Sequence, residues 1–469
     1  MNWSEDSNYN QIERQIERLT DQHKDLMGWA INAKATQSVQ SLMMAKKRNE
    51  MRVYQSRDVD DTSYKVTLYV TGEEGAKTGA STATIQPADA VESQLLQILA
   101  NARLAMNAAY PLAEKPDQEY PNVESSCPEI SANIVESHQS MVKRIEAHVA
   151  SLTNVQVNSA ELYSNVHYHG LKTSTGIEAQ KTTTDVYFEV AMERVPGPNL
   201  QEVLKYWHFV GVGDANLEER LDAVAEETQL TTGALMPPAR TSATILVDSY
   251  AISKFVSAIA TQLSGEAEYA QGPHLKPNDQ LTISDRDEQS DTLTITIDPT
   301  LAQMAKSTAY TEEGLVAQKA DVIVNNEVKH QLLNTRFAHI LGKEPNGIYG
   351  NLVVPAGSAT RESLLESKEE VIEVLDFSSL LVNPTSLTWS SEIKLGRLYQ
   401  QGKPVKTLKG GIVSGNIRES LAGFKFSRDL TRRNTAGGYF EPAGGYLGPE
   451  HMLMWKGISI AGESEQEAV

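Results

Sequence analysis

Runs of alternating apolar and polar residues on both sides of a proline-rich stretch most constrain the fold of this chain. Residues 50–56, 63–72 and 155–193 in the first half, and 281–298 in the second, alternate as strands do. Residues 232–243 (TGALMPPARTSA) carry two adjacent prolines among small residues, which marks a boundary. We therefore expect an α+β fold of two domains: 1–232, an antiparallel sheet with helices, and 238–469, built around a large antiparallel sheet or barrel.

Helical spacing of apolar residues predicts helices between these strands. The first covers residues 9–31, either packed on its own domain or in a short coiled coil, and a second helical stretch fills the interval up to residue 49. Residues 155–193 read as three or four antiparallel strands with turns at Gly170 and Gly176. Further helices are expected at 88–110, 134–151 and 216–230, with turns at Asn325-Asn326 and Gln401-Gly402.

Composition narrows the class of partner. The chain of 469 residues has a formal net charge of −19, which repels phosphate backbones and argues against direct nucleic-acid binding. Its one cysteine, Cys127, excludes an internal disulfide and a cysteine-rich zinc site. The polar start of the sequence has no apolar core of a signal peptide, and no run of about 18 apolar residues is present. We expect a soluble cytoplasmic protein with no membrane contact.

The stretch TILVDSYAISKFVSAIATQLSGE (244–266) is a buried strand that runs into an amphipathic helix. Asp248 stands where an N-cap belongs and is expected to accept a backbone N–H of the first turn. Metallopeptidases place zinc-binding histidines at such a junction, but here it holds Asp248, Ser249 and Ser253. Because zinc prefers His and Cys ligands, the junction predicts no metal site.

The pair His167 and His169 is the sharpest remaining metal candidate. Residues i and i+2 of a strand face the same side, so the two imidazoles could share a metal ion. No third ligand can be identified, and the more ordinary interpretation is two unrelated histidines on one strand face.

The glycine-rich stretch 436–450 (AGGYFEPAGGYLGPE) matches no phosphate-binding pattern. It predicts a flexible loop or, where Gly437, Gly438, Gly444 and Gly445 let a backbone come close, the lining of a peptide groove. Residues 396–404 resemble a phosphate loop only superficially, because Pro404 stands where Ser or Thr would bind magnesium. The residues alone reveal no catalytic constellation.

Six segments, taken in order, resemble the TldD/PmbA family, whose PmbA branch is also called TldE, and the likeness as a whole extends from about residue 10 to 462. The likeness rests on the order and character of the segments more than on identical residues. It includes the strand-to-helix junction described above and the strand-to-helix turn IVSGNIRESL. The matching segments are 50–87, 161–192, 244–266, 310–342, 412–421 and 455–463.

The resemblance implies a function that the residues alone do not. In the TldD branch the junction helix carries H-E-x-x-x-H, which binds zinc together with a C-terminal cysteine; here those positions read Asp248, Ser249 and Ser253, and residues 434–440 hold no cysteine. The chain thus resembles the zinc-less PmbA branch, with no catalytic residue or cofactor of its own. The resemblance implies a TldD-like zinc peptidase subunit as partner. It also implies unfolded peptides as substrates, in leader removal or antitoxin turnover. The older label, modulator of DNA gyrase, reflects an indirect link.

Two alternatives remain open. The chain departs from the family pattern at Asn325-Asn326 and around residues 427–452, as a divergent member would. It could be a stand-alone peptide-binding homodimer without protease activity. A weaker alternative is an independent metallopeptidase that uses His167 and His169.

Overall fold

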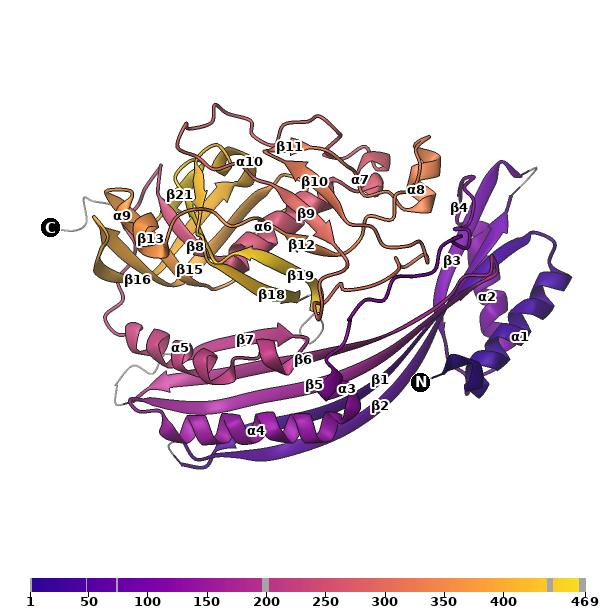
Figure 1. The fold of residues 1–469 in the computed structure, drawn as a ribbon, viewed down its shortest axis with the longest axis horizontal. Coiled ribbons are helices and arrows are strands. Elements are labelled where there is room, and N and C mark those ends of the chain that lie inside the picture. The colour runs from indigo at the N-terminus through magenta and orange to yellow at the C-terminus, as the bar shows by residue number, and fades with distance from the viewer. Residues whose placement is uncertain (1, 48, 73–74, 196–201, 437–441, 464–469) are drawn as a thin grey trace.

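The computed structural model describes residues 2–47, 49–72, 75–195, 202–436 and 442–463. The predicted α+β class is confirmed: helices pack on two large, curled sheets (Figure 1). We use N-terminal half for residues up to 232 and C-terminal half for those from 238. Within the described residues, no helix combines the length and the apolar character needed to cross a membrane.

Very long strands dominate the N-terminal half. β1 is paired along its length with β2 on one side and β5 on the other, and β5 continues into β6, all antiparallel. The elements are α1 (Ser7–Gln22), β1 (Leu26–Ala45), β2 (Met51–Thr71), β3 (Lys77–Ile85), α2 (Val91–Leu104), β4 (Met106–Ala108), α3 (Pro128–Ala132), α4 (Ile134–Ser151), β5 (Val155–Thr173), β6 (Glu178–Arg194), β7 (Val203–Phe209) and α5 (Leu217–Leu230), with short 3₁₀ turns at Trp3–Glu5 and Val212–Asp214.

Shorter elements build the C-terminal half. They are β8 (Ile245–Asp248), α6 (Ser249–Gln262), α7 (Gly265–Tyr269), β9 (Ile295–Asp298), β10 (Ala320–Val324), β11 (Glu327–Val328), α8 (Thr335–Ile340), β12 (Asn351–Val353), α9 (Arg361–Glu366), β13 (Glu370–Phe377), β14 (Leu381–Val382), β15 (Thr388–Gln400), β16 (Lys403–Asn416), α10 (Ile417–Ser420), β17 (Phe424–Phe426), β18 (Leu430–Ala436), β19 (Pro442–Pro449), β20 (His451–Met454) and β21 (Ile458–Ala461).

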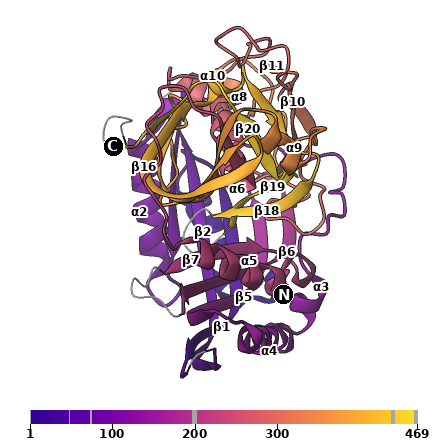
Figure 2. The ribbon, with the colours of Figure 1, turned by 90° about the vertical axis from the view of Figure 1, so that its left-hand side faces the viewer.

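One sheet crosses from half to half. Its 13 strands run in the order β11-β10-β9-β12-β19-β18-β7-β6-β5-β1-β2-β3-β4, and the two halves meet where Asn434 of β18 pairs with His208 of β7. In Figures 1 and 2, β18 lies directly above β7. The second sheet, β17-β20-β8-β13-β15-β16-β21, lies wholly in the C-terminal half. The predicted domain limits at 232 and 238 stay a prediction, and the sheet shared across them ties the halves together.

Apolar packing explains where the helices lie. α4 and α5 cover β5 and β6 through a fully buried cluster that includes Ile145, Leu162 and Leu221. α6 packs against strands of both sheets, and its Ile252 and Phe255 belong to the largest core of the molecule. The predicted apolar stripe of that helix is therefore confirmed as core.

The prediction for residues 23–49 is wrong. The first helix ends at Gln22, and the predicted second helical stretch is β1. Its Ala, Gln, Leu, Met and Lys residues favour helices locally. Pairing on both sides with β2 and β5 supplies backbone hydrogen bonds and cross-strand contacts that override this preference.

The prediction for residues 155–193 had the right strand character but too many turns. The segment forms only β5 and β6, joined by a turn at Gly176, whose φ is +86°. Gly170 lies inside β5, where a Cβ would come within 2.4 Å of the Trp3 ring, so this glycine makes room for a side chain. Both predicted two-residue turns are confirmed, with positive φ at Asn325 and Asn326 and at Gln401 and Gly402.

Candidate functional site

The junction of β8 and α6 is built around Asp248. Its Oδ1 accepts hydrogen bonds from the backbone N–H groups of Tyr250, at 3.1 Å, and Ala251, at 3.4 Å. These are first-turn donors with no acceptor inside the helix, which is why an N-cap carboxylate is favourable here. The predicted capping role of Asp248 is therefore confirmed.

A guanidinium group lies beside this cap. Arg433 of β18 places Nη1 3.8 Å from Oδ2 of Asp248 and donates a hydrogen bond of 3.3 Å to Oγ of Ser249. Its Cζ lies 5.1 Å from the ring centroid of Tyr250. The ammonium of Lys254 lies 5.1 Å from the same centroid, so two cations approach one aromatic ring.

A third cation belongs to the same cluster. Arg220 of α5 lies over the Trp207 ring, and burial, followed by the charge of Arg433, lowers its pKa to about 10. Burial, again followed by Arg433, lowers the pKa of Lys254. We call Arg433, Lys254, Arg220 and Asp248 the junction cluster. It holds three cations and one carboxylate.

These residues do not fit a zinc ion. Ser253 is fully buried and donates its hydroxyl to the carbonyl of Tyr250, at 2.8 Å, while the Ser249 oxygen accepts from Arg433. Serine hydroxyls are not usual zinc ligands, and a guanidinium beside the remaining carboxylate repels a metal cation. In the part of the chain that the structure describes, no three His, Cys, Asp or Glu side chains gather as a metal site would need.

A second ionic cluster lies between the halves and is neutral. Lys205 of β7 lies 3.0 Å from Oε2 of Glu227 on α5 and 3.2 Å from Oδ1 of Asp376 on β13. Lys394 of β15 lies 3.1 Å from the other oxygen of Asp376. Burial acts to lower the pKa of Lys205, but Glu227 and Asp376 outweigh it and raise that pKa. We call these four residues the bridging cluster, in which two cations face two carboxylates.

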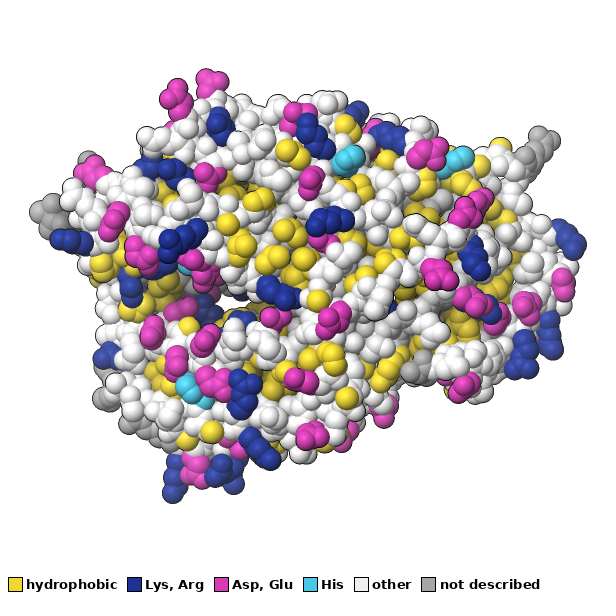
Figure 3. All heavy atoms as spheres, viewed as in Figure 1, with side chains coloured by type: hydrophobic (Ala, Val, Ile, Leu, Met, Phe, Trp, Pro, Cys, Tyr) yellow, Lys and Arg dark blue, Asp and Glu magenta, His cyan; other side chains and the backbone are white. Residues whose placement is uncertain are grey.

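Figure 3 shows a hollow between the halves, with acidic and basic side chains on its walls. It opens where Figure 1 places α5 and β7 below and β18 above, the elements that carry Arg220, Lys205 and Arg433. Each ionic cluster therefore has members on elements that border this hollow.

His167 and His169 lie on one strand face, as predicted, but each has a protein partner. Nε2 of His167 lies 2.5 Å from Asp185, and its Nδ1 lies 2.8 Å from the Thr36 hydroxyl. Nε2 of His169 lies 3.0 Å from the Thr183 hydroxyl, and burial, followed by Lys181, lowers the pKa of His169 to about 3. These contacts explain both histidines as parts of the sheet.

Of the four candidate groove glycines, Gly437 and Gly438 lie outside the described residues. Gly444 and Gly445 lie in β19. Gly445 is buried, and a Cβ there would come within 2.2 Å of Oδ1 of Asn351, so packing alone accounts for this glycine. A groove-lining role for these glycines stays a prediction.

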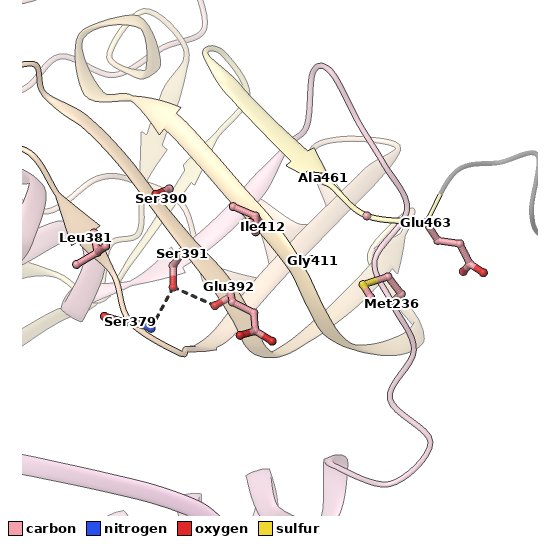
Figure 4. Close-up of a pocket in the computed structure, with 11 residues that line it drawn as sticks. Met236, Ser379, Leu381, Ser390, Ser391, Glu392, Gly411, Ile412, Ala461 and Glu463 are labelled. Atoms are coloured by element: carbon pink, nitrogen blue, oxygen red, sulfur yellow. Dashed lines mark hydrogen bonds between the residues drawn. The ribbon is translucent and has the colours of Figure 1, made fainter.

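A second surface feature escaped the sequence analysis. A hollow of about 890 Å³ lies over β15, β16 and β21, with Ser390 and Gly411 among its lining residues (Figure 4). Its apolar rim is well exposed, with Leu381 at 67%, Ile412 at 53% and Met236 at 49%. A second hollow of about 970 Å³ adjoins it and shares Leu381 and Ser390.

Arg433 also escaped the sequence analysis. The signal was present, because two consecutive arginines in an alternating run place one guanidinium on each face of a strand. Arg432 reaches the backbone carbonyl of Gln303, whereas Arg433 reaches α6. The alternation alone does not predict which face of β18 packs against α6.

Comparison with known proteins gives related folds. Residues 239–461 match the model of the PmbA/TldA metallopeptidase C-terminal domain. A proposed modulator of a DNA gyrase from Thermotoga maritima is 17% identical, with a TM-score of 0.75 over 97% of this chain and 100% of the other. A similarly described protein from Bacteroides thetaiotaomicron is 16% identical, with a TM-score of 0.73 over 98% of this chain and 100% of the other. TldE from Thermococcus kodakarensis is 14% identical, with a TM-score of 0.70 over 96% of this chain and 100% of the other. No curated protein sequence matched.

Proposed function

We propose that this chain, which belongs to the PmbA/TldD family through its residues 239–461, is a zinc-free subunit that completes a cytoplasmic metallopeptidase and holds its unfolded peptide substrate. The partner is a TldD-like chain that carries the zinc ion and the general base. The substrates are unfolded peptides such as leader segments or antitoxins.

The junction cluster carries this proposal. The positions that resemble the zinc ligands of the TldD branch are Asp248, Ser249 and Ser253; the first caps a helix, and the third is buried with its hydroxyl committed to the backbone. Arg433 supplies positive charge beside these residues. A permanent cation can hold an anionic or polar group, but it cannot lower the pKa of a bound water as zinc does. The role that fits is binding without hydrolysis.

The hollow between the halves supports substrate holding. It is bordered by elements of both halves (Figure 3). The bridging cluster joins two of these elements, β7 and α5, to β13 of the C-terminal half. A hollow with polar walls suits an extended chain that presents its backbone amides, because recognition through the main chain depends little on side-chain identity.

The test is reconstitution with the TldD-like protein of the same organism. The two chains are mixed, passed over a size-exclusion column, and assayed on an unfolded peptide with and without a zinc chelator. We expect co-elution, and cleavage that needs both chains and stops with the chelator. No complex, and a homodimer that binds peptide without cutting it, would contradict the proposal and favour a stand-alone peptide-binding protein.

A further inference from the structure

The four residues of the junction cluster carry three positive charges and one negative charge. Its single carboxylate, Asp248, uses one oxygen as a helix cap and keeps the other 3.8 Å from Arg433, beyond hydrogen-bond distance. Among the described residues, Lys254 has no carboxylate partner, and Nε and Nη2 of Arg433 donate to no acceptor. This imbalance stands out in a chain of net charge −19.

The cations also repel one another. Arg433 is a cause of the lowered pKa of both Arg220 and Lys254, after burial in each case. Asp214 and Glu219 partly offset this repulsion at Arg220. At Lys254 burial and the charge of Arg433 both lower the pKa, so an incoming anion relieves a cost there. The side chain of Arg433 is 26% exposed, so an anion can reach it from solvent.

The geometry favours a carboxylate. Within the described part of the chain, Nε and Nη2 on one edge of the Arg433 guanidinium have no acceptor, and this edge matches the two oxygens of a carboxylate. The nearby Lys254 ammonium adds a point charge. A polyphosphate or a nucleic acid carries many negative charges, which this acidic chain, of net charge −19, repels. A ligand with a single carboxylate meets far less repulsion.

We propose that Arg433 and Lys254 form a carboxylate-binding site beside the first turn of α6, and that this site selects peptides presenting a free carboxylate. This inference rests on the proposed peptide-holding function. The carboxylate is either the C-terminus of the peptide or an Asp or Glu side chain, and both present the same chemistry to the guanidinium.

The test measures peptide affinity of the isolated chain by fluorescence anisotropy. Three labelled peptides of about ten residues share one sequence of Gly, Ala, Ser and Thr: one with a free C-terminal acid, one with a C-terminal amide, and one amide with a single internal Glu. We expect the acid to bind about five- to tenfold more tightly than the amide, as one charge-assisted contact provides. If the Glu peptide binds as tightly as the acid, the site accepts carboxylate side chains. If it binds as weakly as the amide, the site is specific for a C-terminal carboxylate.

Arg433→Gln and Lys254→Gln are the test variants, and each should bring the ratio of acid to amide affinity to about 1–2. Arg428→Gln is the matched control, because Arg428 also lies 3.8 Å from an aspartate, Asp429, but on an exposed surface. It should keep the ratio. Ionic strength of about 1 M should shrink the ratio in the wild type, since screening then acts within about 3 Å.

Two results would overturn the inference while leaving peptide holding intact: equal binding of all three peptides by the wild type, or a preference that survives in both test variants. Failure of every peptide to bind would reject the inference and peptide holding together. The peptides are assayed without the zinc partner, so a failed reconstitution does not decide the outcome.

Discussion

The bridging cluster and the junction cluster each contain charged residues from both halves of the molecule. They differ in the balance of positive and negative charge. In the first, Lys205 and Lys394 face Glu227 and Asp376 at 3.0 to 3.2 Å. The second holds three cations and one carboxylate, Asp248, whose nearest guanidinium nitrogen, on Arg433, is 3.8 Å away. A neutral, close-packed cluster fixes the position of two elements, whereas an unbalanced, looser one is suited to receive a ligand.

Removing the central cation of the bridging cluster should have the largest effect. Lys205→Met leaves Glu227 buried without a cation, and we expect the free energy of unfolding to fall by about 3 kcal/mol, the lower end for breaking a buried ion pair. Urea unfolding followed by circular dichroism measures this. The double variant Lys205→Met/Glu227→Gln should recover a large part of the loss. An unchanged midpoint for the single variant would show that the cluster stabilises nothing.

The dependence of stability on pH tests whether His169 is neutral in the folded protein. His169 has a pKa of about 3 in the fold against 6.5 when unfolded, so between these values the unfolded state binds the extra proton. Its contribution to stability is therefore complete above pH 6.5 and declines as the pH falls toward 3. The decline should reach about 1.4 kcal/mol per pH unit for this one group. His138, with a pKa lowered by burial to about 4, acts in the same direction.

The variant His169→Gln should flatten that slope between pH 6 and about 4, as measured by urea unfolding at a series of pH values. His330→Gln, at an exposed position, is the matched control. A slope that is identical in the wild type and in His169→Gln would refute the neutral, buried state of this histidine.

Substitutions at Asp248 separate its capping role from its charge. Asp248→Ala should lower the free energy of unfolding by about 1 kcal/mol, because two first-turn N–H groups lose their acceptor. Asp248→Asn keeps a capping oxygen and should cost little. By removing the only carboxylate of the junction cluster, it should also tighten binding of the acid peptide. Equal stability of the Ala and Asn variants would contradict the capping role.

Removal of Arg433 should have the smallest effect on stability. Its ion pair is loose and partly exposed, and Arg433→Gln relieves repulsion with Lys254, so the free energy of unfolding should change by no more than about 0.5 kcal/mol. Thermal and urea unfolding measure this. A loss comparable to that of Lys205→Met would mean that Arg433 is a structural residue like those of the bridging cluster.

Local patterns predicted what depends on neighbours in sequence. The α+β class, the cap at Asp248, the core stripe of α6 and the turns at Asn325-Asn326 and Gln401-Gly402 all follow from spacing or from the φ tolerance of single residues. They are correct because the interactions that cause them span only a few positions.

Contacts between distant segments could not be predicted in the same way. The composition of β1 favours a helix, and only its pairing with the two flanking strands makes it a strand. Arg433 meets Ser249 across a separation of 184 positions. His167 likewise meets Thr36 through the pairing of β1 with β5. The partners of a polar side chain in a large sheet depend on strand order, which periodicity does not encode.

The most direct test measures stability and peptide selectivity on the same two variants. Lys205→Met should lose stability and keep the preference for the acid over the amide peptide, while Arg433→Gln should keep stability and lose that preference. This crossed result would establish that the two clusters do different work. Parallel losses in both variants, or the preference persisting in Arg433→Gln, would contradict the claim that the junction cluster is a binding site.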